Sequence, residues 1–217
     1  MTATAMPVLL PAPTVELVEA ECRKFDSDAS TKLGEEAIAQ LREQFPRNTE
    51  VSHVLLKILV LNKVYSTRID DMEVWPLARH IAGLGIDSLM DQGDAAAVIR
   101  IYKCANLRMY YSFATKFCSW HNPTAYPIYD RYTDVCLWAY RKQDRFADFQ
   151  RQDLGRYEKL VEIVSTFRHR YGLHCFTFRQ MDKFLWRTGA RILGVIAPQA
   201  DESRITGVTT GSLTEGN

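Results

Sequence analysis

The segment Val51–Val64 constrains the fold of this chain more than any other, because its apolar residues lie nearly all around a helix. Its apolar positions include Val51, Val54, Leu55, Ile58, Leu59, Leu61 and Val64. A helix of this kind is usually the buried centre of a helical domain. Glycine is sparse, at 11 of 217 residues, and no Asn-Gly or Asp-Gly dipeptide separates two alternating runs, as in many β-hairpins. The sequence therefore predicts an all-α fold.

Helical periodicity continues on both sides of this segment and predicts about nine to ten helices in all. Thr14, Ser30-Thr31 and Thr49 are expected to cap the first three. Pro76 is expected to bend the helix that contains it. The expected helices cover residues 14–25, 30–45, 49–64, 70–82, 91–105, 110–120, 129–141, 154–171 and 177–193.

These helices are expected to form one compact domain at residues 13–197, with the most informative motifs at residues 50–140. Residues 1–12 are expected to be flexible. Residues 198–217 are polar and rich in Gly, Ser and Thr, so they are expected to form a disordered tail.

Composition argues against several classes of protein. The longest apolar run, Val54–Val64, is interrupted by Lys57 and Lys63, so no membrane span is predicted. The first residues lack the basic region of a secretory signal. The five cysteines are widely spaced, and no Cys/His cluster has metal-binding spacing. This pattern favours reduced thiols, a cytoplasmic location and no bound metal.

Charge is divided unevenly along the chain, although the formal net charge is only +1. Residues 1–100 carry 10 Lys and Arg against 15 Asp and Glu, whereas residues 101–217 carry 17 against 11. The basic second half is compatible with a polyanionic partner, but an asymmetry of this size is common and identifies no partner by itself.

A second informative stretch is FATKFCSWHNPTAYPIYDRYT, residues 113–133, which places a lysine and an aspartate on either side of a proline-bounded turn. The first helix breaks at Asn122-Pro123, and Asp130 is predicted to lie in the first turn of the next helix. Two interpretations are open. In one, Asp130 caps the helix and Lys116 is solvated. In the other, the two side chains converge on a cleft, where a lysine with a lowered pKa is a nucleophile and the acid stabilises a developing cation.

Residues 50–140 resemble the core of the helix-hairpin-helix DNA glycosylase superfamily, of the endonuclease-III and 8-oxoguanine-glycosylase type. The family's hairpin and lysine correspond to Ser112-Phe113-Ala114-Thr115-Lys116. Its aspartate segment corresponds to Pro127-Ile128-Tyr129-Asp130-Arg131-Tyr132. The spacing of 14 residues between the lysine and the aspartate is about one helical turn shorter than is usual in the family.

A second match lies upstream, where Val60-Leu61-Asn62-Lys63-Val64-Tyr65-Ser66-Thr67-Arg68-Ile69 resembles the end of the family's long central helix and the start of the next. In the family, polar residues of this region project into DNA and into the space that the extruded base leaves. The resemblance implies that Asn62 contacts the orphaned base. It also implies DNA contacts by its neighbours Lys63, Tyr65, Ser66, Thr67 and Arg68.

The resemblance assigns the chemistry to two residues. Asp130 stabilises the cation-like transition state at C1′ while the bond between base and sugar breaks. Lys116 is the nucleophile of a bifunctional enzyme, giving a Schiff base and strand cleavage. The aromatic residues Trp120, Tyr129 and Tyr132, together with Arg131, are expected to bind the base or the DNA, because base faces stack on aromatic rings. For Trp120 and Tyr129 the alternative is ordinary core packing.

The sequence departs from the family pattern in two ways. The family hairpin normally contains two glycines, which let backbone N–H groups approach a DNA phosphate, and Ser112-Phe113-Ala114-Thr115 contains none. The iron–sulfur cysteines of the endonuclease-III branch are also absent. The protein is therefore expected to use neither a cluster nor any other cofactor.

Three hypotheses follow. The first is a DNA glycosylase that flips and excises a damaged or modified base from double-stranded DNA, with or without lyase activity, in repair or in defence against phage with modified DNA. The second is a DNA-binding module of the same fold without chemistry, which the missing glycines favour. The third is an unrelated helical structural protein in which Asp130 is only a cap.

Overall fold

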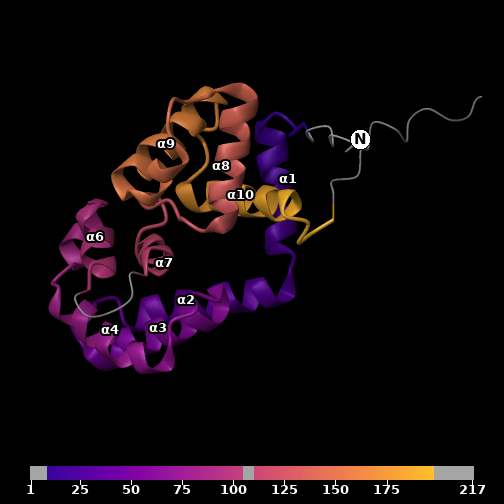
Figure 1. Cartoon of the computed structure of the whole chain (residues 1–217). Helices are drawn as coiled ribbons and strands as arrows, with labels where there is room; N and C mark the ends of the chain where they lie inside the picture. The colour runs from indigo at the N-terminus through magenta and orange to yellow at the C-terminus, as the bar shows by residue number, and fades with distance from the viewer. Residues whose placement is uncertain (1–8, 105–109, 198–217) are drawn as a thin grey trace, which may run out of the picture.

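The computed structural model describes residues 9–104 and 110–197, and within these ranges every regular element is a helix (Figure 1). The predicted all-α fold is confirmed. The elements in this part of the chain are α1 (Val15–Asp26), α2 (Ala29–Gln44), α3 (Val51–Tyr65), α4 (Asp71–Gly83), α5 (Asp87–Gln92), α6 (Ala96–Tyr102), α7 (Tyr111–His121), α8 (Arg131–Asp144), the 3-10 helix η1 (Arg151–Gly155), α9 (Tyr157–Arg170) and α10 (Phe178–Ile192). Among the helices of the described ranges, none is long and apolar enough to cross a membrane.

The helices form two lobes, and the second lobe contains the first and the last of the described helices. Figure 1 shows α2 to α7 in the first lobe and α1, α8, α9 and α10 in the second, with α7 lying between them. In the second lobe, α10 packs against both α8 and α1. In the first lobe, α3 packs against α2, α4 and α7. The segment between α7 and α8 therefore crosses from one lobe to the other.

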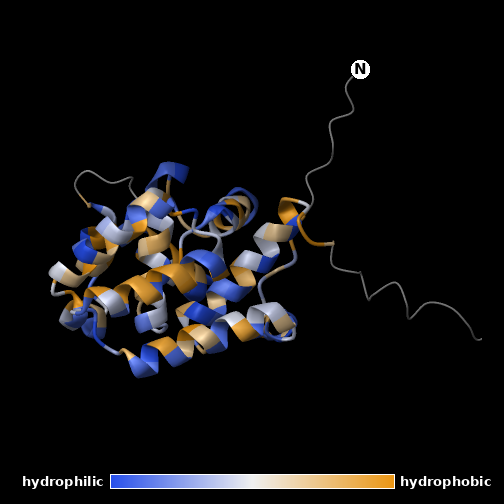
Figure 2. Cartoon of the chain, turned by 90° about the horizontal axis from the view of Figure 1, so that it is seen from below, coloured by the Kyte–Doolittle hydropathy of each residue, from blue (hydrophilic) through white to orange (hydrophobic). Residues whose placement is uncertain are grey.

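Helix α3 contributes one side to the core, rather than being its centre. Val54, Ile58 and Leu61 are buried, whereas Leu56 and Leu59 are 43% and 46% exposed. The expectation of a fully buried helix is wrong because α2, α4 and α7 cover only part of its circumference. Figure 2 shows hydrophobic and hydrophilic residues alternating along most helices, which is typical of helices that lie half in a core.

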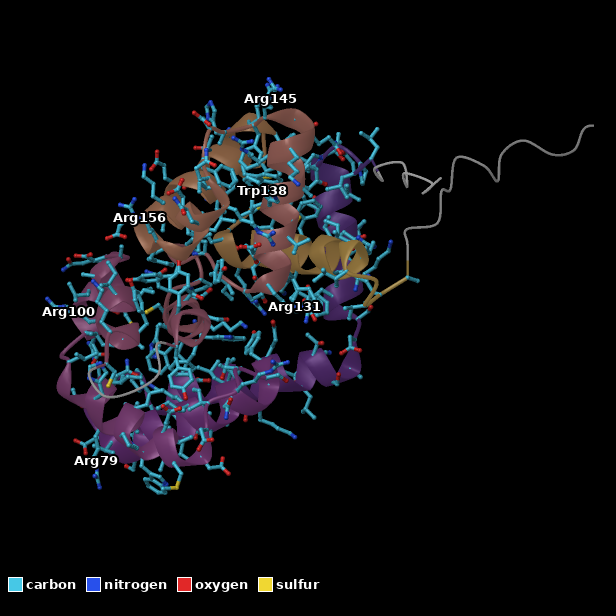
Figure 3. All side chains as sticks on the ribbon, viewed as in Figure 1. Arg79, Arg100, Arg131, Trp138, Arg145 and Arg156 are labelled. Atoms are coloured by element: carbon cyan, nitrogen blue, oxygen red, sulfur yellow. The ribbon has the colours of Figure 1, made fainter. Side chains whose placement is uncertain are left out.

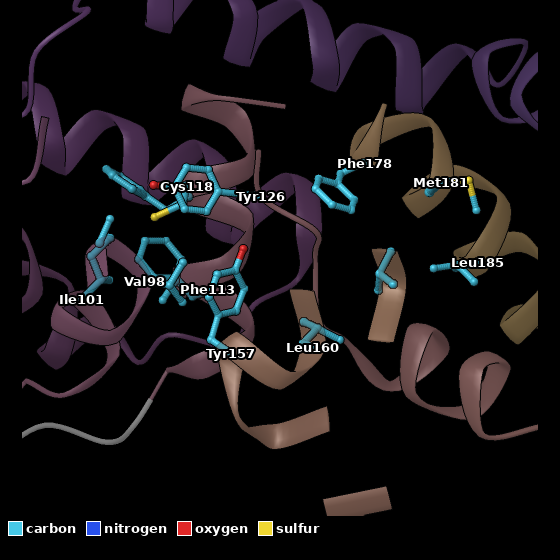
Figure 4. Close-up of a cluster of buried hydrophobic side chains, with 14 of the residues drawn as sticks. Val98, Ile101, Phe113, Cys118, Tyr126, Tyr157, Leu160, Phe178, Met181 and Leu185 are labelled. Carbon is cyan, nitrogen blue, oxygen red and sulfur yellow. The ribbon is translucent and has the colours of Figure 1, made fainter. Parts of the chain in front are cut away.

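The core runs through both lobes. Figure 4 shows Val98 of α6, Phe113 of α7 and Tyr157 of α9 gathered in one cluster, with Phe178 and Leu185 of α10 on its other side. All five are buried. Residues from the first and second lobes therefore belong to one hydrophobic core.

Several predicted boundaries differ from the structure. The helix expected at residues 91–105 begins only at Ala96, as α6. A separate helix that the sequence did not predict, α5, precedes it and ends at Gly93, which adopts a left-handed conformation (φ 74°). Asp28, rather than Ser30-Thr31, caps α2, and Glu50 precedes α3 without a side-chain cap in place of the expected Thr49. The helix expected from residue 154 begins with η1.

The start of the described chain is anchored to α8. Leu10 exchanges two hydrogen bonds with the Gln143 side chain, at 2.8 and 3.0 Å. The Tyr140 hydroxyl donates to the Pro11 carbonyl at 2.8 Å. The sequence predicts that residues 1–12 are flexible, but Leu10 and Pro11 are held by these hydrogen bonds. Residues 1–8 and the predicted tail at 198–217 lie outside the described ranges.

Candidate active site

A cleft of about 830 Å³ lies between the two lobes. Its walls come from α1, α2, the end of α3 with the loop after it, α7, residues 128 and 130–132, and α10. Of the twelve residues that the sequence singled out, nine line it: Lys63, Tyr65, Ser66, Thr67, Arg68, Lys116, Asp130, Arg131 and Tyr132. The two stretches quoted from the sequence therefore meet at one site.

Lys116 and Asp130 form a buried pair in this cleft. The Lys116 Nζ lies 3.8 Å from the Asp130 Oδ2, and the two side chains are only 7% and 12% exposed. The same Nζ donates a hydrogen bond to the Ser112 Oγ at 3.2 Å and lies 5.6 Å from the centre of the Tyr65 ring. The prediction that the lysine and the aspartate converge on one cleft is confirmed.

Asp130 is also a helix cap. Its Oδ1 accepts hydrogen bonds from the backbone N–H groups of Tyr132 and Thr133, each at 2.9 Å, at the start of α8. The two interpretations of Asp130 are thus compatible, because the cap uses one oxygen and leaves Oδ2 facing Lys116. Since the cap fixes the carboxylate plane, Oδ2 is held in place without any contact to a substrate.

Two contacts position the turn that carries Asp130. The Tyr129 N–H donates to the Thr115 Oγ1 at 3.1 Å, which ties the turn to α7. On the other side, α10 approaches so closely at Gly189 that an added Cβ would lie 2.2 Å from the Tyr132 carbonyl oxygen. The Lys116–Asp130 distance therefore depends on helix packing in both lobes.

Helix α10 supplies a charged floor to the cleft that the sequence did not reveal. The Arg179 guanidinium pairs with Glu35 of α2 and with Asp182 of its own helix, and it donates to the Tyr65 hydroxyl at 2.8 Å. Burial raises the pKa of Tyr65 above its usual range, so its hydroxyl stays neutral. The contacts that hold this floor together join residues far apart in the sequence: Glu35 and Tyr65 precede Arg179 by 144 and 114 positions.

Asp182 is the carboxyl group that α10 contributes to the cleft. Its side chain is 6% exposed, and Asp182 lines the cleft. Burial raises the pKa of Asp182 to about 6; Arg179 opposes the shift, and Asp130 adds to it. The sequence carried one signal for this residue: an aspartate among the buried Phe178, Met181 and Leu185, on the apolar face of an amphipathic helix.

The rim of the cleft carries cations without ion-pair partners among the described residues. Lys63, Arg68 and Arg131 are all exposed and line the cleft. Figure 3 shows Arg131 at the end of α8 that faces the first lobe, far from the labelled Arg79 and Arg145. Its guanidinium lies 5.1 Å from the centre of the Tyr132 ring.

The loop that carries Arg68 is held in an unusual backbone conformation. Ser66 and Arg68 have φ angles of 48° and 59°, in the left-handed region that non-glycine residues rarely adopt. Asn62 stabilises this loop: its Oδ1 accepts from the Thr67 hydroxyl at 2.9 Å and the Ile69 N–H at 3.1 Å, and its Nδ2 donates to the Ile69 carbonyl at 3.1 Å.

Three of the predicted site residues do not line the cleft. Asn62 is engaged inside the loop just described, so it positions cleft residues rather than facing the cleft. Trp120 lies behind the floor, with its ring 5.3 Å from the Arg179 guanidinium carbon. Tyr129 points away, with its hydroxyl 3.2 Å from the Asp134 carboxylate and its ring 4.9 Å from that of Tyr111. For Trp120 and Tyr129 the packing alternative describes the structure better.

The expected hairpin at Ser112-Phe113-Ala114-Thr115 is not a hairpin. These residues form the first turns of α7, and the Thr115 hydroxyl donates to the Ser112 carbonyl as in a regular helix, at 2.9 Å. The connection between α6 and α7 is residues 103–110, of which 105–109 lie outside the described ranges. That connection contains no glycine.

The described residues offer no group of three or more His, Cys, Asp and Glu side chains that could hold a metal ion. The acids of the cleft are instead each paired with a cation. Asp130 faces Lys116, and both Glu35 and Asp182 face Arg179.

The fold and the site define an all-helical protein with a buried lysine–aspartate pair in a cleft between two lobes. The chain belongs to the family HI_0787_N, described as an N-terminal domain, which matches residues 17–125. An uncharacterized protein of Haemophilus influenzae is 36% identical over 149 residues, which are 67% of this chain and 70% of the relative. No solved structure matches the chain. The family match includes Lys116 and ends before Asp130 and α10.

Proposed function

We propose that this protein is a DNA glycosylase of the helix-hairpin-helix type, which extrudes a damaged or modified base into the cleft and cleaves its bond to the sugar. The observation that carries the proposal is the buried Lys116–Asp130 pair, 3.8 Å apart in a cleft of about 830 Å³. Cavities of about 300–1,000 Å³ are usual for small-molecule sites, so an extruded nucleotide with a modified base is a reasonable occupant.

The charges of the cleft support a nucleic-acid partner. The three acids that line it are each paired with a cation, whereas Lys63, Arg68 and Arg131 on the rim have no ion-pair partner in the described ranges. The charge that remains available to a ligand is therefore positive. Lys and Arg side chains at such positions bind phosphates and give salt-dependent affinity for DNA.

The geometry of the pair suits the proposed chemistry. When the C1′–N bond breaks, its electron pair leaves with the base and positive charge develops at C1′. The Asp130 Oδ2 is fixed by the helix cap and stabilises that charge without having to reorient. In the bifunctional form of the proposal, the Lys116 amine attacks C1′, which gives a Schiff base and then strand cleavage.

A DNA-binding module without chemistry is the second candidate. It is favoured by the absence of glycine from Ser112-Phe113-Ala114-Thr115, since the family hairpin uses glycines to bring backbone N–H groups to a phosphate. Under either candidate, we propose that the protein acts on double-stranded DNA in the cytoplasm, in repair or in defence against phage with modified bases.

The test is a panel of labelled duplexes that carry oxidised, alkylated, deaminated or hypermodified bases. Each is incubated with the wild type, Asp130→Asn or Lys116→Ala, then treated with alkali or trapped with borohydride. We expect abasic sites with the wild type and a loss of about 10³-fold with Asp130→Asn. We expect a trapped covalent adduct that is absent with Lys116→Ala if the enzyme is bifunctional.

The matched control is Asp134→Asn, which makes the same chemical change four residues along α8, outside the cleft, where Asp134 pairs with Arg151. Excision by this variant should match the wild type. Salt-sensitive DNA binding with no abasic product on any duplex would support the binding module instead. No binding and no product would refute both candidates.

A further inference from the structure

Asp182 has an unpaired oxygen in a site where every other acid is engaged. Its Oδ2 pairs with Arg179, but its Oδ1 is buried and has no hydrogen-bond partner among the described residues. The side chain is 6% exposed, and the residue lines the cleft. Buried polar atoms in folded proteins are nearly always hydrogen-bonded, so an orphaned carboxyl oxygen in a cleft wall calls for a ligand.

The charges around Asp182 come from each lobe. Arg179 on its own helix is the nearest cation, while Glu35 of α2 and Asp130 of α8 disfavour a negative charge on it and Lys116 of α7 favours one. Burial and the two neighbouring acids outweigh the cations, so the pKa of Asp182 is raised. A carboxyl group in this setting carries a proton up to about pH 6, where it is able to give that proton away.

We propose that Asp182 is the general acid of the cleft, donating its proton to the extruded base as the base departs, and that the substrates are therefore uncharged modified bases. This inference rests on the proposed glycosylase function. It distinguishes two classes of lesion. A base that is already cationic, such as N7-methylguanine, leaves as a neutral molecule without help, whereas an uncharged base leaves as an anion unless it is protonated.

The step balances within the site. The C1′–N bond breaks, and its electron pair stays with the base. The base takes the Asp182 proton and leaves neutral, and Asp182 becomes a carboxylate beside Arg179. The cation at C1′ is captured by the Lys116 amine or by water, and the proton that this nucleophile releases returns to Asp182. No further reactant is needed beyond the water.

The test compares two duplexes under single-turnover conditions, one with an uncharged oxidised or hypermodified base and one with N7-methylguanine. We expect Asp182→Asn to excise the uncharged base about 10²-fold or more slowly than the wild type. If the wild type excises N7-methylguanine, the rate of Asp182→Asn on that base should be within about threefold of the wild-type rate. For the uncharged base, the wild-type rate should fall as pH rises above about 6, and the residual rate of Asp182→Asn should not.

Glu35→Gln is the matched control, because Glu35 also pairs with Arg179 and lines the cleft. If Asp182 only holds Arg179 in place, both variants will slow both duplexes alike and leave the pH profile of the wild type intact. That result, or an Asp182→Asn variant as fast as the wild type, would overturn the inference and leave the glycosylase proposal standing. A wild type that excises only N7-methylguanine would also overturn it. A wild type inactive on both duplexes would remove the proposed function and this inference together.

Discussion

The charged side chains on the floor of the cleft form ion pairs, whereas those on its rim do not, within the described ranges. The floor comprises Lys116 and Asp130 together with Arg179 and Asp182. Lys116 and Asp182 are buried, the side chains of Asp130 and Arg179 are only 12% exposed, and all four are paired. On the rim, the cations Lys63, Arg68 and Arg131 are exposed and without ion-pair partners in the described ranges. Pairing in a buried site fixes side chains in one geometry, which chemistry requires. Unpaired cations at a surface remain available to a partner such as a phosphate backbone.

This difference gives each region its own expected phenotype. Substitutions on the floor should abolish excision or change its dependence on pH and on the base, with little effect on DNA affinity. Changes to the rim should weaken affinity while leaving the rate on bound DNA intact.

Gly189→Ala should break the floor through packing alone. The added Cβ would lie 2.2 Å from the Tyr132 carbonyl oxygen, so α10 must move away from the turn that carries Asp130. We expect the free energy of unfolding to fall by about 3 kcal/mol or more and excision to be lost, as measured by denaturant unfolding and by the duplex assay. Gly83→Ala is the control, because its Cβ would meet no atom within 4 Å. Equal stability of the two variants would show that α10 does not set the position of α8.

The pH dependence of the unfolding free energy should show that the pKa of Asp182 is raised in the folded protein. Asp182 keeps its proton up to about pH 6 when folded, but loses it near pH 4 when unfolded. The stability that this proton contributes is therefore complete below about pH 4 and is lost as pH rises through about 6. Between pH 4 and 7.5, the unfolding free energy of the wild type should fall by about 2–3 kcal/mol relative to that of Asp182→Asn. A difference that is constant with pH would mean that Asp182 is an ordinary ionised carboxylate.

Substitutions on the rim should change the affinity for DNA and not the rate of excision. Arg68→Ala and Arg131→Ala should each weaken binding to duplex DNA several-fold, by about 1 kcal/mol, and reduce the slope of log K against log salt by about 1. The rate of excision on saturated DNA should not change. Arg79→Ala, an exposed arginine on the far side of the first lobe in Figure 3, is the control and should leave the slope unchanged. Unchanged slopes for both rim variants would mean that DNA does not lie across this rim.

The parts of the site that the sequence predicted are those that local rules determine. Thr14 caps α1 as expected, and Asp130 caps α8, because a capping side chain acts within three residues of itself. The convergence of Lys116 and Asp130 was also predictable, since a short turn joins their two helices. The end of α5 at Gly93 had a signal too, because Asp94 follows this glycine and accepts a hydrogen bond from the Ala96 N–H at the start of α6.

The parts that the sequence did not reveal depend on distant contacts or on side-chain orientation. The place of Arg179 in the floor depends on Glu35, 144 residues earlier, and no pattern within α10 points to that partner. Asn62 occupies the predicted segment, yet all its hydrogen bonds turn inward to the loop at residues 67–69. Whether a polar side chain faces a cleft or supports its wall is decided by the folded backbone, and here the left-handed Ser66 and Arg68 decide it.

The most direct test of the central claim, that the buried floor cleaves a glycosidic bond, is the identification of a free base released from DNA. Genomic DNA from phages with and without modified cytosines is incubated with the wild type or with Asp130→Asn, and the small-molecule fraction is analysed by mass spectrometry. We predict a single released base with the wild type and none with Asp130→Asn at matched DNA occupancy. Release of the same base by both proteins, or of no base from any modified or damaged DNA that the wild type binds, would contradict the claim.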